Sequence, residues 1–398
     1  MYFDTRNKSD CSGCTTCMNS CPSTAIKMIE DEEGFYYPYI DDEKCIHCDL
    51  CRRVCSWEQP SFYNDKEPLA FAAVLSNKTE RQRSTSGGLF YEIASWVISQ
   101  NGIVYGAVFD EHLQLHHKAA ETLGELQPMR GSKYIQSNLG DIFKSVKEKL
   151  ETGRLCFFTG TGCQIAGLKS FLKKEYSNLI TADLVCHGVP SQKLFNLHLD
   201  FLEDRYRDKV VGYQFRDNKR GRGCEICKFK SGRTLKKPSY ELSPYLYSFM
   251  HSFTLRLSCY NCKYATLPRQ GDITLADYWG IERFFPKFDR ENGVSLVLLN
   301  NTKGKSIWDG IKTNCIIAES NLSDAVVYNG NINNTTSKPA IRDFIYKEIA
   351  QKGYARVASE EFRCPNYLWV SMVKKISNYR VIIAIHGLVR KIKSVVKG

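Results

Sequence analysis

Eight cysteines in the first sixty residues fall into two runs with the same spacing, C-x2-C-x2-C-x3-C. The first run is Cys11, Cys14, Cys17 and Cys21, and the second is Cys45, Cys48, Cys51 and Cys55. This repeat is typical of bacterial paired [4Fe–4S] clusters, in which the fourth cysteine of each run binds the other cluster. It therefore predicts one cluster on Cys11, Cys14, Cys17 and Cys55, and a second on Cys45, Cys48, Cys51 and Cys21.

The residues around the runs fit a small ferredoxin. Pro22 follows the first run and should keep its fourth thiol off a helix, whereas Ser56 replaces the usual proline in the second copy. Gly34 divides two short strand-like stretches between the runs. A structural zinc site is the alternative, but zinc prefers two well-separated C-x2-C pairs that make one tetrahedron. Two runs of four thiols favour iron–sulfur clusters.

Four further cysteines are spaced so that they could hold a third cluster. Cys163 and Cys186 each follow a strand-like stretch, and Cys259 and Cys262 form a C-x2-C pair. Four thiols that converge would suit a third [4Fe–4S] cluster. The alternative is that these are core cysteines, since buried free cysteine is common. Cys156, Cys315 and Cys364 are scattered and are interpreted as core residues, and Cys224 and Cys227 lack an obvious second pair.

The whole chain has the composition of a globular protein. Its 398 residues predict two or three domains, and 43% hydrophobic and 25% charged residues exclude a disordered or fibrous chain. The longest aliphatic run, 381–385, is far below the roughly 18 residues of a membrane span. The first ten residues have no apolar core for a signal peptide, so we expect a cytoplasmic protein. Seventeen cysteines then indicate metal or redox chemistry rather than disulfides.

Charge is unevenly distributed. Residues 1–60 carry 6 basic and 11 acidic side chains, and residues 363–398 carry 8 basic and no acidic ones. The acidic surface of the first segment could contact a basic electron donor or could simply be solvated. Because the basic residues are divided between a central loop and a tail, we expect no nucleic-acid partner, despite the net charge of +12.

The elements that must position the later cysteines alternate between strand and helix. Strands are expected at 69–77, 103–109, 113–119, 155–158 and 180–185, and helices at 86–100, 139–150, 164–172 and 191–207. Strand, loop and helix repeated twice predict α/β packing, with Cys163 and Cys186 in loops at the carboxyl ends of parallel strands. The sequence has no G-x-G-x-x-G, so a standard dinucleotide fold is not supported.

Several motifs in order resemble the coenzyme F420 hydrogenase/dehydrogenase beta-subunit family over roughly residues 70–300, of the type associated with polysaccharide biosynthesis. They are Ser86-Gly87-Gly88, Gly131 to Ser137, Thr159 to Gln164, Cys186-His187-Gly188, Cys259-x2-Cys262 and Asp272 to Gly280. Gly162 departs from the pattern, because relatives often have proline before the cysteine.

The resemblance implies FAD and a further [4Fe–4S] cluster on Cys163, Cys186, Cys259 and Cys262. It makes Ser86, Gly87 and Gly88, at a helix start, candidates for the FAD diphosphate. It makes Lys133, Tyr134, Gln136 and Ser137 candidates for the flavin and its ribityl chain. Lys133 could instead form only a surface ion pair. His187 is a candidate proton donor, or it could orient the cluster loop; no catalytic residue is assigned.

Two basic segments could contact further partners. Residues 215–222, FRDNKRGR, resemble a stretch in polysaccharide-associated members and could hold a phosphorylated or sugar-linked substrate, or be a solvated hairpin. Residues 376–398 form a basic amphipathic pattern that could lie peripherally on the inner membrane face or pack on protein.

We therefore expect an α+β chain: a bacterial-type ferredoxin module at 1–60, then an α/β flavin-binding domain with an additional iron–sulfur site. Its parts are an N-terminal family region at 67–152, a C-terminal family region at 153–330 and an extension at 331–398. The favoured function is a ferredoxin- or F420-dependent flavin oxidoreductase, whose electron donor is a ferredoxin or a reduced deazaflavin. The alternative is a non-catalytic electron-transfer subunit, and a third is a scaffold of glycan synthesis.

Overall fold

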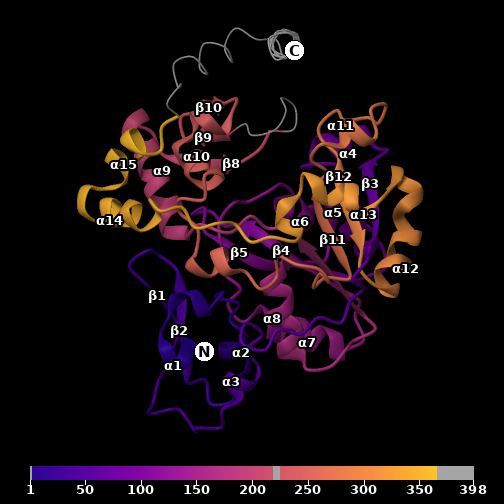
Figure 1. Ribbon diagram of the computed structural model, residues 1–398, viewed down its shortest axis with the longest axis horizontal. Coiled ribbons are helices and arrows are strands. Elements are labelled where there is room, and N and C mark those ends of the chain that lie inside the picture. Colours follow the sequence, from indigo (N-terminus) through magenta and orange to yellow (C-terminus); the bar gives the residue numbers. More distant parts are fainter. Residues whose placement is uncertain (1, 218–224, 365–398) are drawn as a thin grey trace, which may run out of the picture.

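The computed structural model describes residues 2–217 and 225–364 (Figure 1). Its N-terminal segment forms the indigo lobe at one end of the molecule. The lobe contains α1 (Tyr2–Thr5), η1 (Lys8–Asp10), α2 (Thr16–Ser20), β1 (Ile26–Glu30), β2 (Tyr36–Ile40) and α3 (Leu50–Arg53). Strands β1 and β2 pair antiparallel around the predicted turn. Gly34 in that turn has φ +88°, and a Cβ there would lie 2.2 Å from Cβ of Lys193, so glycine is required.

An eight-stranded sheet forms the centre of the body, in the order β13-β3-β12-β11-β7-β6-β4-β5. The strands are β3 (Leu69–Leu75), β4 (Ile103–Phe109), β5 (Leu115–Ala120), β6 (Cys156–Thr161), β7 (Leu179–Leu184), β11 (Ile273–Asp277), β12 (Ser295–Leu299) and β13 (Cys315–Ser320). Strands β4, β6, β7 and β11 run parallel, and the outer strands pair antiparallel. The predicted parallel units are confirmed.

Helices cover both faces of this sheet. On one face α5 (Leu89–Ser99) and α12 (Thr302–Ile311) bury Ile93, Val97 and Trp308 against alternate residues of β4, β6 and β7. On the other face α7 (Ile142–Glu151) and α8 (Gly162–Leu172) bury a second set, including Phe143 and Ile165. The sheet takes strands from both expected family regions, 67–152 and 153–330.

A second layer lies beside the sheet. It consists of a three-stranded sheet, β8 (Val210–Gln214), β9 (Glu225–Phe229) and β10 (Thr234–Lys237), with α9 (Gln192–Tyr206), α10 (Pro244–Met250), α14 (Arg342–Lys352) and α15 (Tyr354–Glu360). The short elements are α4 (Lys78–Gln82), α6 (Leu123–Leu126), η2 (Gln127–Met129), η3 (Tyr240–Leu242), η4 (Leu257–Asn261), α11 (Ile281–Phe284), η5 (Lys312–Asn314), α13 (Leu322–Val327) and η6 (Gly330–Ile332).

Two of the expected segments fall outside the described residues. The first is residues 218–224, which include most of the basic stretch and Cys224. The second is the amphipathic pattern at 376–398. Within the described ranges, no helix combines the length and apolar character needed to cross a bilayer.

Candidate functional site

The two cysteine runs adopt the same backbone geometry. Between the first and third cysteines of each run, two residues at equivalent positions have positive φ. They are Gly13 (+72°) and Thr15 (+61°) in the first run, and His47 (+50°) and Asp49 (+56°) in the second. Such alternation turns successive amides toward the inside of the loop, as in other iron–sulfur sites. The internal repeat of the sequence is thus also a structural repeat.

The thiols of the two runs are brought together crosswise. Burial raises the pKa of the Cys17 thiol well above its ordinary value, and the nearby thiols of Cys14, Cys11 and Cys55 raise it further. Burial likewise raises the pKa of Cys51, with a contribution from Cys21. Cys55, the fourth thiol of the second run, therefore lies near the first three thiols of the first run, and Cys21 lies near Cys51 of the second run. We call Cys11, Cys14, Cys17 and Cys55 the inner set, and Cys45, Cys48, Cys51 and Cys21 the outer set.

A cavity lies among the inner thiols. Its lining includes all four of them together with Asp10, Ser12, Gly13, Thr15, Met28, Pro38, Trp57 and the aromatic rings of α1. Cys21 is the C-cap of α2 and has an extended backbone conformation, so it lies outside the helix, as predicted from Pro22. An enclosure lined by four sulfur donors and few other polar groups fits an iron–sulfur cluster, since soft thiolates select such clusters. Across the described residues, no three His, Cys, Asp or Glu side chains are placed to hold a metal ion between them.

The four later cysteines also converge. Cys163 lies in the first turn of α8, directly after β6, and Cys186 follows β7. Burial raises the pKa of the Cys163 thiol strongly, and the thiols of Cys262, Cys186 and Cys259 add to the shift. Gly188, with φ +127°, packs closely here: a Cβ would lie 2.6 Å from Cδ1 of Leu255 and 3.2 Å from Cβ of Cys259. Parallel strands end at one edge of the sheet, which is why this third set forms there.

The inner set and the third set share one apolar cluster. Trp57, Tyr264 and Ala166 are buried together, and Cys55, Cys163 and Cys262 pack against them. The Tyr264 hydroxyl donates to the carbonyl of Ser56 at 2.5 Å, and Lys263 Nζ donates to the carbonyl of Trp57 at 2.6 Å. The residues after Cys262 thus hold the residues after Cys55.

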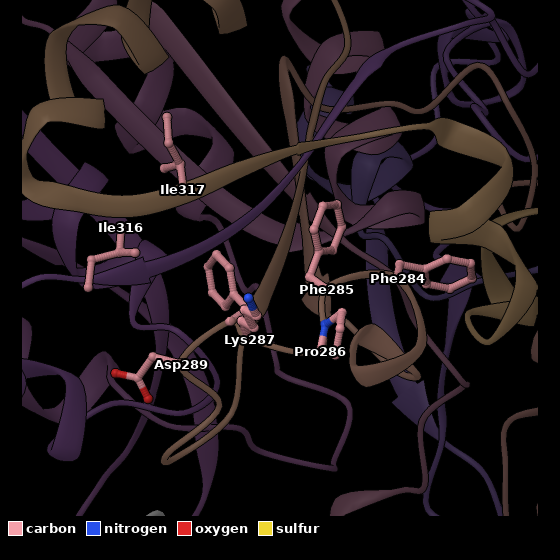
Figure 2. Close-up of a pocket in the computed structure, with 8 residues that line it drawn as sticks. Phe284, Phe285, Pro286, Lys287, Asp289, Ile316 and Ile317 are labelled. Carbon is pink, nitrogen blue, oxygen red and sulfur yellow. The ribbon is translucent and has the colours of Figure 1, made fainter.

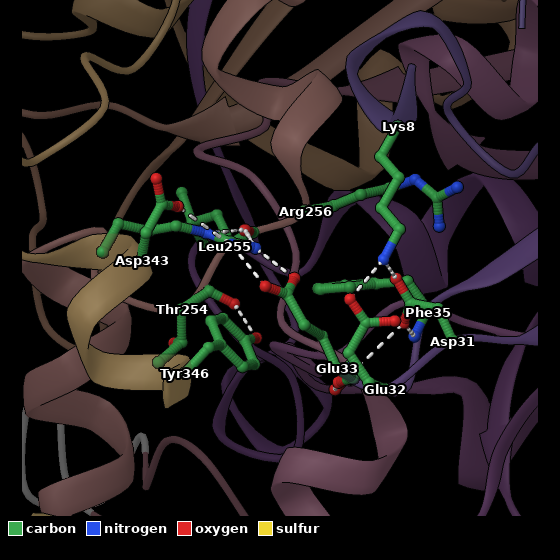
Figure 3. Close-up of polar contacts among 12 residues, drawn as sticks. Lys8, Asp31, Glu32, Glu33, Phe35, Thr254, Leu255, Arg256, Asp343 and Tyr346 are labelled. Carbon is green, nitrogen blue, oxygen red and sulfur yellow. Dashed lines mark hydrogen bonds and ion pairs between the residues drawn. The ribbon is translucent and has the colours of Figure 1, made fainter. Parts of the chain in front are cut away.

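Two buried arginines fix the ferredoxin lobe to the body (Figure 3). Arg256, three residues before Cys259, donates to the carbonyls of Cys11 at 2.8 Å and Tyr36 at 3.0 Å, and to Oε1 of Gln136 at 3.1 Å. Its guanidinium lies 4.2 Å from the centroid of the Tyr37 ring. Arg342 of α14 pairs with both carboxylate oxygens of Glu33 in the β1–β2 turn, at 2.6 and 2.5 Å.

Some carboxylates of the ferredoxin lobe therefore form ion pairs within the chain and are not available to a partner. Besides Glu33, the turn carboxylate of Asp31 pairs with Lys8 at 2.8 Å. The carboxylates that remain exposed include Asp42, Glu43 and Asp49, beside the outer thiol set.

The two segments expected to hold FAD meet beside α4 and α5. Arg130 donates to Ser84 Oγ at 2.7 Å, and Ser132 donates to Thr85 Oγ1 at 3.4 Å. Ser86 Oγ donates to the Val294 carbonyl at 2.7 Å, and the Gly87 amide donates to Ser295 Oγ at 3.0 Å. A Cβ at Gly87 would lie 2.1 Å from the carbonyl oxygen of Ala73, so packing alone already requires this glycine.

The residues from 133 to 137 have defined partners inside the chain. Lys133 Nζ donates to three carbonyls, those of Met129, Arg130 and Gly131, and burial lowers the pKa of Lys133 to about 7. The Tyr134 ring stacks on Phe249 at 4.7 Å. Gln136 donates to the Ser12 carbonyl at 2.9 Å, and so contacts the ferredoxin lobe, and Ser137 Oγ lies 2.8 Å from Nδ1 of His117.

The other expected site residues are also engaged. His187 Nε2 lies 2.9 Å from Ser252 Oγ and 3.2 Å from the Phe249 carbonyl. Arg216 pairs with both carboxylate oxygens of Asp277, at 2.8 and 3.2 Å. Of the cysteines expected in the core, Cys156 is buried, and Cys315 and Cys364 are partly buried against apolar clusters. Cys227, for which no second pair was found, is also buried in an apolar cluster.

Sequence reasoning missed several residues that hold this site together. Arg256, Tyr264, Arg81, Arg130 and His117 are all buried polar or amphipathic side chains. The one available signal was position: Arg256 and Tyr264 flank the C-x2-C pair.

A shallow hollow lies elsewhere, at the β13 edge of the sheet (Figure 2). Phe284, Phe285, Pro286, Lys287, Phe288, Asp289, Ile316 and Ile317 line it. No cysteine contributes to its lining.

The match to a 4Fe-4S dicluster domain, which covers both cysteine runs, gives the class of protein: the proteins with ferredoxin-type iron–sulfur domains. Two family models match the chain. Residues 10–58 match the 4Fe-4S dicluster domain, and residues 153–325 match the C terminus of the coenzyme F420 hydrogenase/dehydrogenase beta subunit. The resemblance seen in the sequence is thereby confirmed for residues 153–325, which match the C-terminal part of this beta-subunit family, and for the 4Fe-4S dicluster domain at residues 10–58.

One similar solved structure is a chain of the F420-reducing [NiFe] hydrogenase complex from Methanosarcina barkeri. It is 16% identical, with a TM-score of 0.44, over 75% of this chain and 92% of that one. No curated protein matched the chain.

Proposed function

We propose that the chain is an iron–sulfur electron-transfer protein that acts as a subunit or module of a redox enzyme related to the F420 hydrogenases. The observation that carries this proposal is the convergence of the inner set and of the third set, which share one apolar cluster. A [4Fe–4S] cluster held by such a set supplies one-electron transfer. The family match supports this role better than the flavin oxidoreductase favoured from the sequence.

Electron transfer requires redox sites at fixed distances in an interior without water, and buried side chains of this chain meet both requirements. Trp57 and Tyr264 exclude water between the inner and third sets, since both are under 5% exposed. Arg256 and Arg342 keep the ferredoxin lobe in one position on the body through buried, charge-assisted hydrogen bonds. Fixed distances between redox sites in a dry interior are what an electron-transfer protein requires.

FAD binding remains a second proposal, because one observation favours an anion near the expected site. Arg81 leaves Nε and Nη1 without hydrogen-bond partners, and Arg130 leaves Nε without one. Buried donors of this kind are costly unless paired. Arg130 donates to Ser84 Oγ, two residues before the segment Ser86 to Gly88 where the diphosphate was expected. Each arginine also pairs with one carboxylate, Arg81 with Asp289 and Arg130 with Glu80. A bound flavin would couple one-electron and two-electron transfer.

Three expectations from the sequence stay predictions. They are a phosphorylated or sugar-linked substrate in polysaccharide synthesis, an F420 or ferredoxin electron donor, and the scaffold role. Arg216, expected to contact such a substrate, already pairs with Asp277. A cytoplasmic location and peripheral membrane contact are likewise proposals. Deleting residues 376–398 should abolish co-sedimentation with anionic liposomes, and unchanged binding would exclude this tail as the membrane contact.

The experiment is to purify the protein anaerobically, measure iron, sulfide and flavin, and record EPR spectra after dithionite reduction. We expect about twelve irons per chain, from three clusters of four. The reduced protein should then pass electrons to an added redox protein, but not to F420 alone. Turnover of F420 without a partner would favour the flavin oxidoreductase. Redox-silent clusters would overturn the electron-transfer proposal.

A further inference from the structure

The outer thiol set lies at the molecular surface, whereas the inner set lies against the body. Cys48 is the one exposed cysteine among those in residues 2–217 and 225–364. Inner thiols such as Cys17 line a buried cavity, and Cys55 packs with Trp57 and Tyr264. Because the lobe is fixed on the body in this orientation, the outer set, and not the inner set, faces the molecular surface.

The loop that carries this outer set has the composition of a contact surface. Ile46, between Cys45 and Cys48, is 63% exposed, which is unusual for a large aliphatic side chain. Residues 41–49 carry four acidic side chains and one basic one, and Asp42, Glu43 and Asp49 are exposed. Arg52 pairs with Asp49 at 3.6 Å and Arg53 donates to the Cys48 carbonyl at 3.0 Å, so the acidic rim consists mainly of Asp42 and Glu43. An apolar centre with an acidic rim complements a partner with an apolar centre and a basic rim.

The geometry points to the Cys45–Asp49 loop, with Asp42 and Glu43, as the docking surface for a small redox protein whose contact face is basic. Ile46 makes the apolar contact, and the exposed carboxylates steer the approach. This inference rests on the proposed electron-transfer function and assigns it a surface and a partner type. One electron passes between the chain and its partner, and no bond forms or breaks.

The test uses cytochrome c, a small basic haem protein, as the probe. The full-length protein is reduced with dithionite, the excess reductant is removed, and reduction of ferric to ferrous haem is followed at low and high salt. Replacing Asp42→Asn together with Glu43→Gln should lower the second-order rate constant about five- to tenfold at low salt and flatten its salt dependence. Ile46→Ala should weaken binding of oxidised cytochrome c, measured by calorimetry, by several-fold.

Matched controls distinguish an effect of this surface from an effect of net charge and from an effect of lost clusters. Asp204→Asn together with Glu291→Gln removes two exposed carboxylates from the body and should leave rate and affinity unchanged. Ile316→Ala, at another exposed isoleucine, should also have no effect. Iron content and reduction by methyl viologen should be the same in all variants.

Two outcomes would overturn the proposed docking surface. Both differ from the outcome that would overturn the proposed electron-transfer function. If the loop variants behave as the controls do, docking occurs elsewhere. If the body control loses as much rate as the loop variant, net charge rather than this surface governs the reaction. A wild-type protein that methyl viologen cannot reduce would instead overturn the electron-transfer function.

Discussion

Gly167 of helix α8 lies directly against Cys14 of the ferredoxin lobe. A Cβ at position 167 would be 3.0 Å from Cβ of Cys14 and 3.2 Å from its sulfur. The Thr16 hydroxyl donates to the Gly167 carbonyl at 3.0 Å. Because Cys163 is one turn earlier on the same helix, this contact brings an inner thiol to within about a helical turn of a third-set thiol.

Replacing Gly167→Ala should separate the two parts of the site. The added methyl group would press on Cys14, and the helix or the cysteine loop must shift. Overpacking of this kind costs roughly 1–3 kcal/mol of unfolding free energy. We expect a lower midpoint of chemical unfolding and weaker magnetic coupling between the reduced inner and third sites in EPR spectra.

Gly310→Ala is the matched control for this prediction. Gly310 lies in helix α12, where a Cβ would make only ordinary contacts with Trp96 at 3.4–3.5 Å. Alanine there should stabilise the helix by up to about 1 kcal/mol. If Gly167→Ala is as well tolerated as Gly310→Ala, the close packing of α8 on Cys14 is not maintained in solution.

Crosswise ligation by the two cysteine runs can be tested by iron counts in double variants. Cys11→Ser with Cys55→Ser removes two thiols of the inner set and should cost about four irons. Cys45→Ser with Cys55→Ser removes one thiol from each set and should cost about eight irons. The reverse pattern would show that each run holds its own cluster. Elemental analysis of anaerobically purified variants measures the difference.

Arg256 should stabilise the fold and raise the reduction potential of the inner site. Its guanidinium is fully buried and donates to the carbonyls of Cys11 and Tyr36. Arg256→Gln should cost roughly 2–4 kcal/mol, because buried acceptors lose charged donors. Loss of a buried positive charge should also make the inner midpoint potential more negative, on the order of 50 mV, about 1 kcal/mol for one electron.

Arg256→Lys separates these two effects. Lysine keeps the positive charge, but its single ammonium group cannot replace the planar guanidinium that reaches three acceptors at once. We expect most of the stability loss with little change in potential, as followed by a redox titration with EPR detection. Equal potentials in Arg256→Gln and the wild type would contradict the electrostatic role.

Local spacing and periodicity predicted much of the architecture. The cysteine repeat predicted the paired loops, and strands β4, β6 and β7 and helices α5, α8 and α9 lie within a few residues of their expected bounds. These signals are local, because a ligand loop or an amphipathic helix is specified by neighbouring residues. The rule that parallel strands end at one edge placed Cys163 and Cys186 together, whereas the C-x2-C pair was added from its spacing and from the family resemblance.

The contacts between the two parts could not be predicted in the same way. Gly167 has no positive φ and no turn signal, and it is the close approach of Thr16 and Cys14 that explains why it is glycine. Gln136 was interpreted as a flavin contact, yet its amide bonds to Ser12 of the ferredoxin lobe. Such pairings join residues more than a hundred positions apart, so no local pattern encodes them.

His117 predicts how stability changes with pH. Its ring is buried, with Nδ1 2.8 Å from Ser137 Oγ and Nε2 2.9 Å from the Thr159 carbonyl, and burial lowers its pKa to about 4. The unfolded chain, with an ordinary pKa near 6.5, binds this proton more readily than the folded one. Stability is therefore full above about pH 6.5 and falls as the pH drops toward 4.

Between pH 7 and 5.5 this one group should cost about 1 kcal/mol of unfolding free energy. Anaerobic urea unfolding at the two pH values measures the loss, and His117→Gln, which keeps a side chain able to hydrogen-bond, should reduce it by that amount. His112→Gln is the control, since that imidazole is exposed and should leave the pH dependence unchanged. If His117→Gln keeps the full pH dependence, the imidazole is already protonated in the folded protein at pH 5.5, and its hydrogen bonds with Ser137 and Thr159 would have to be reassigned.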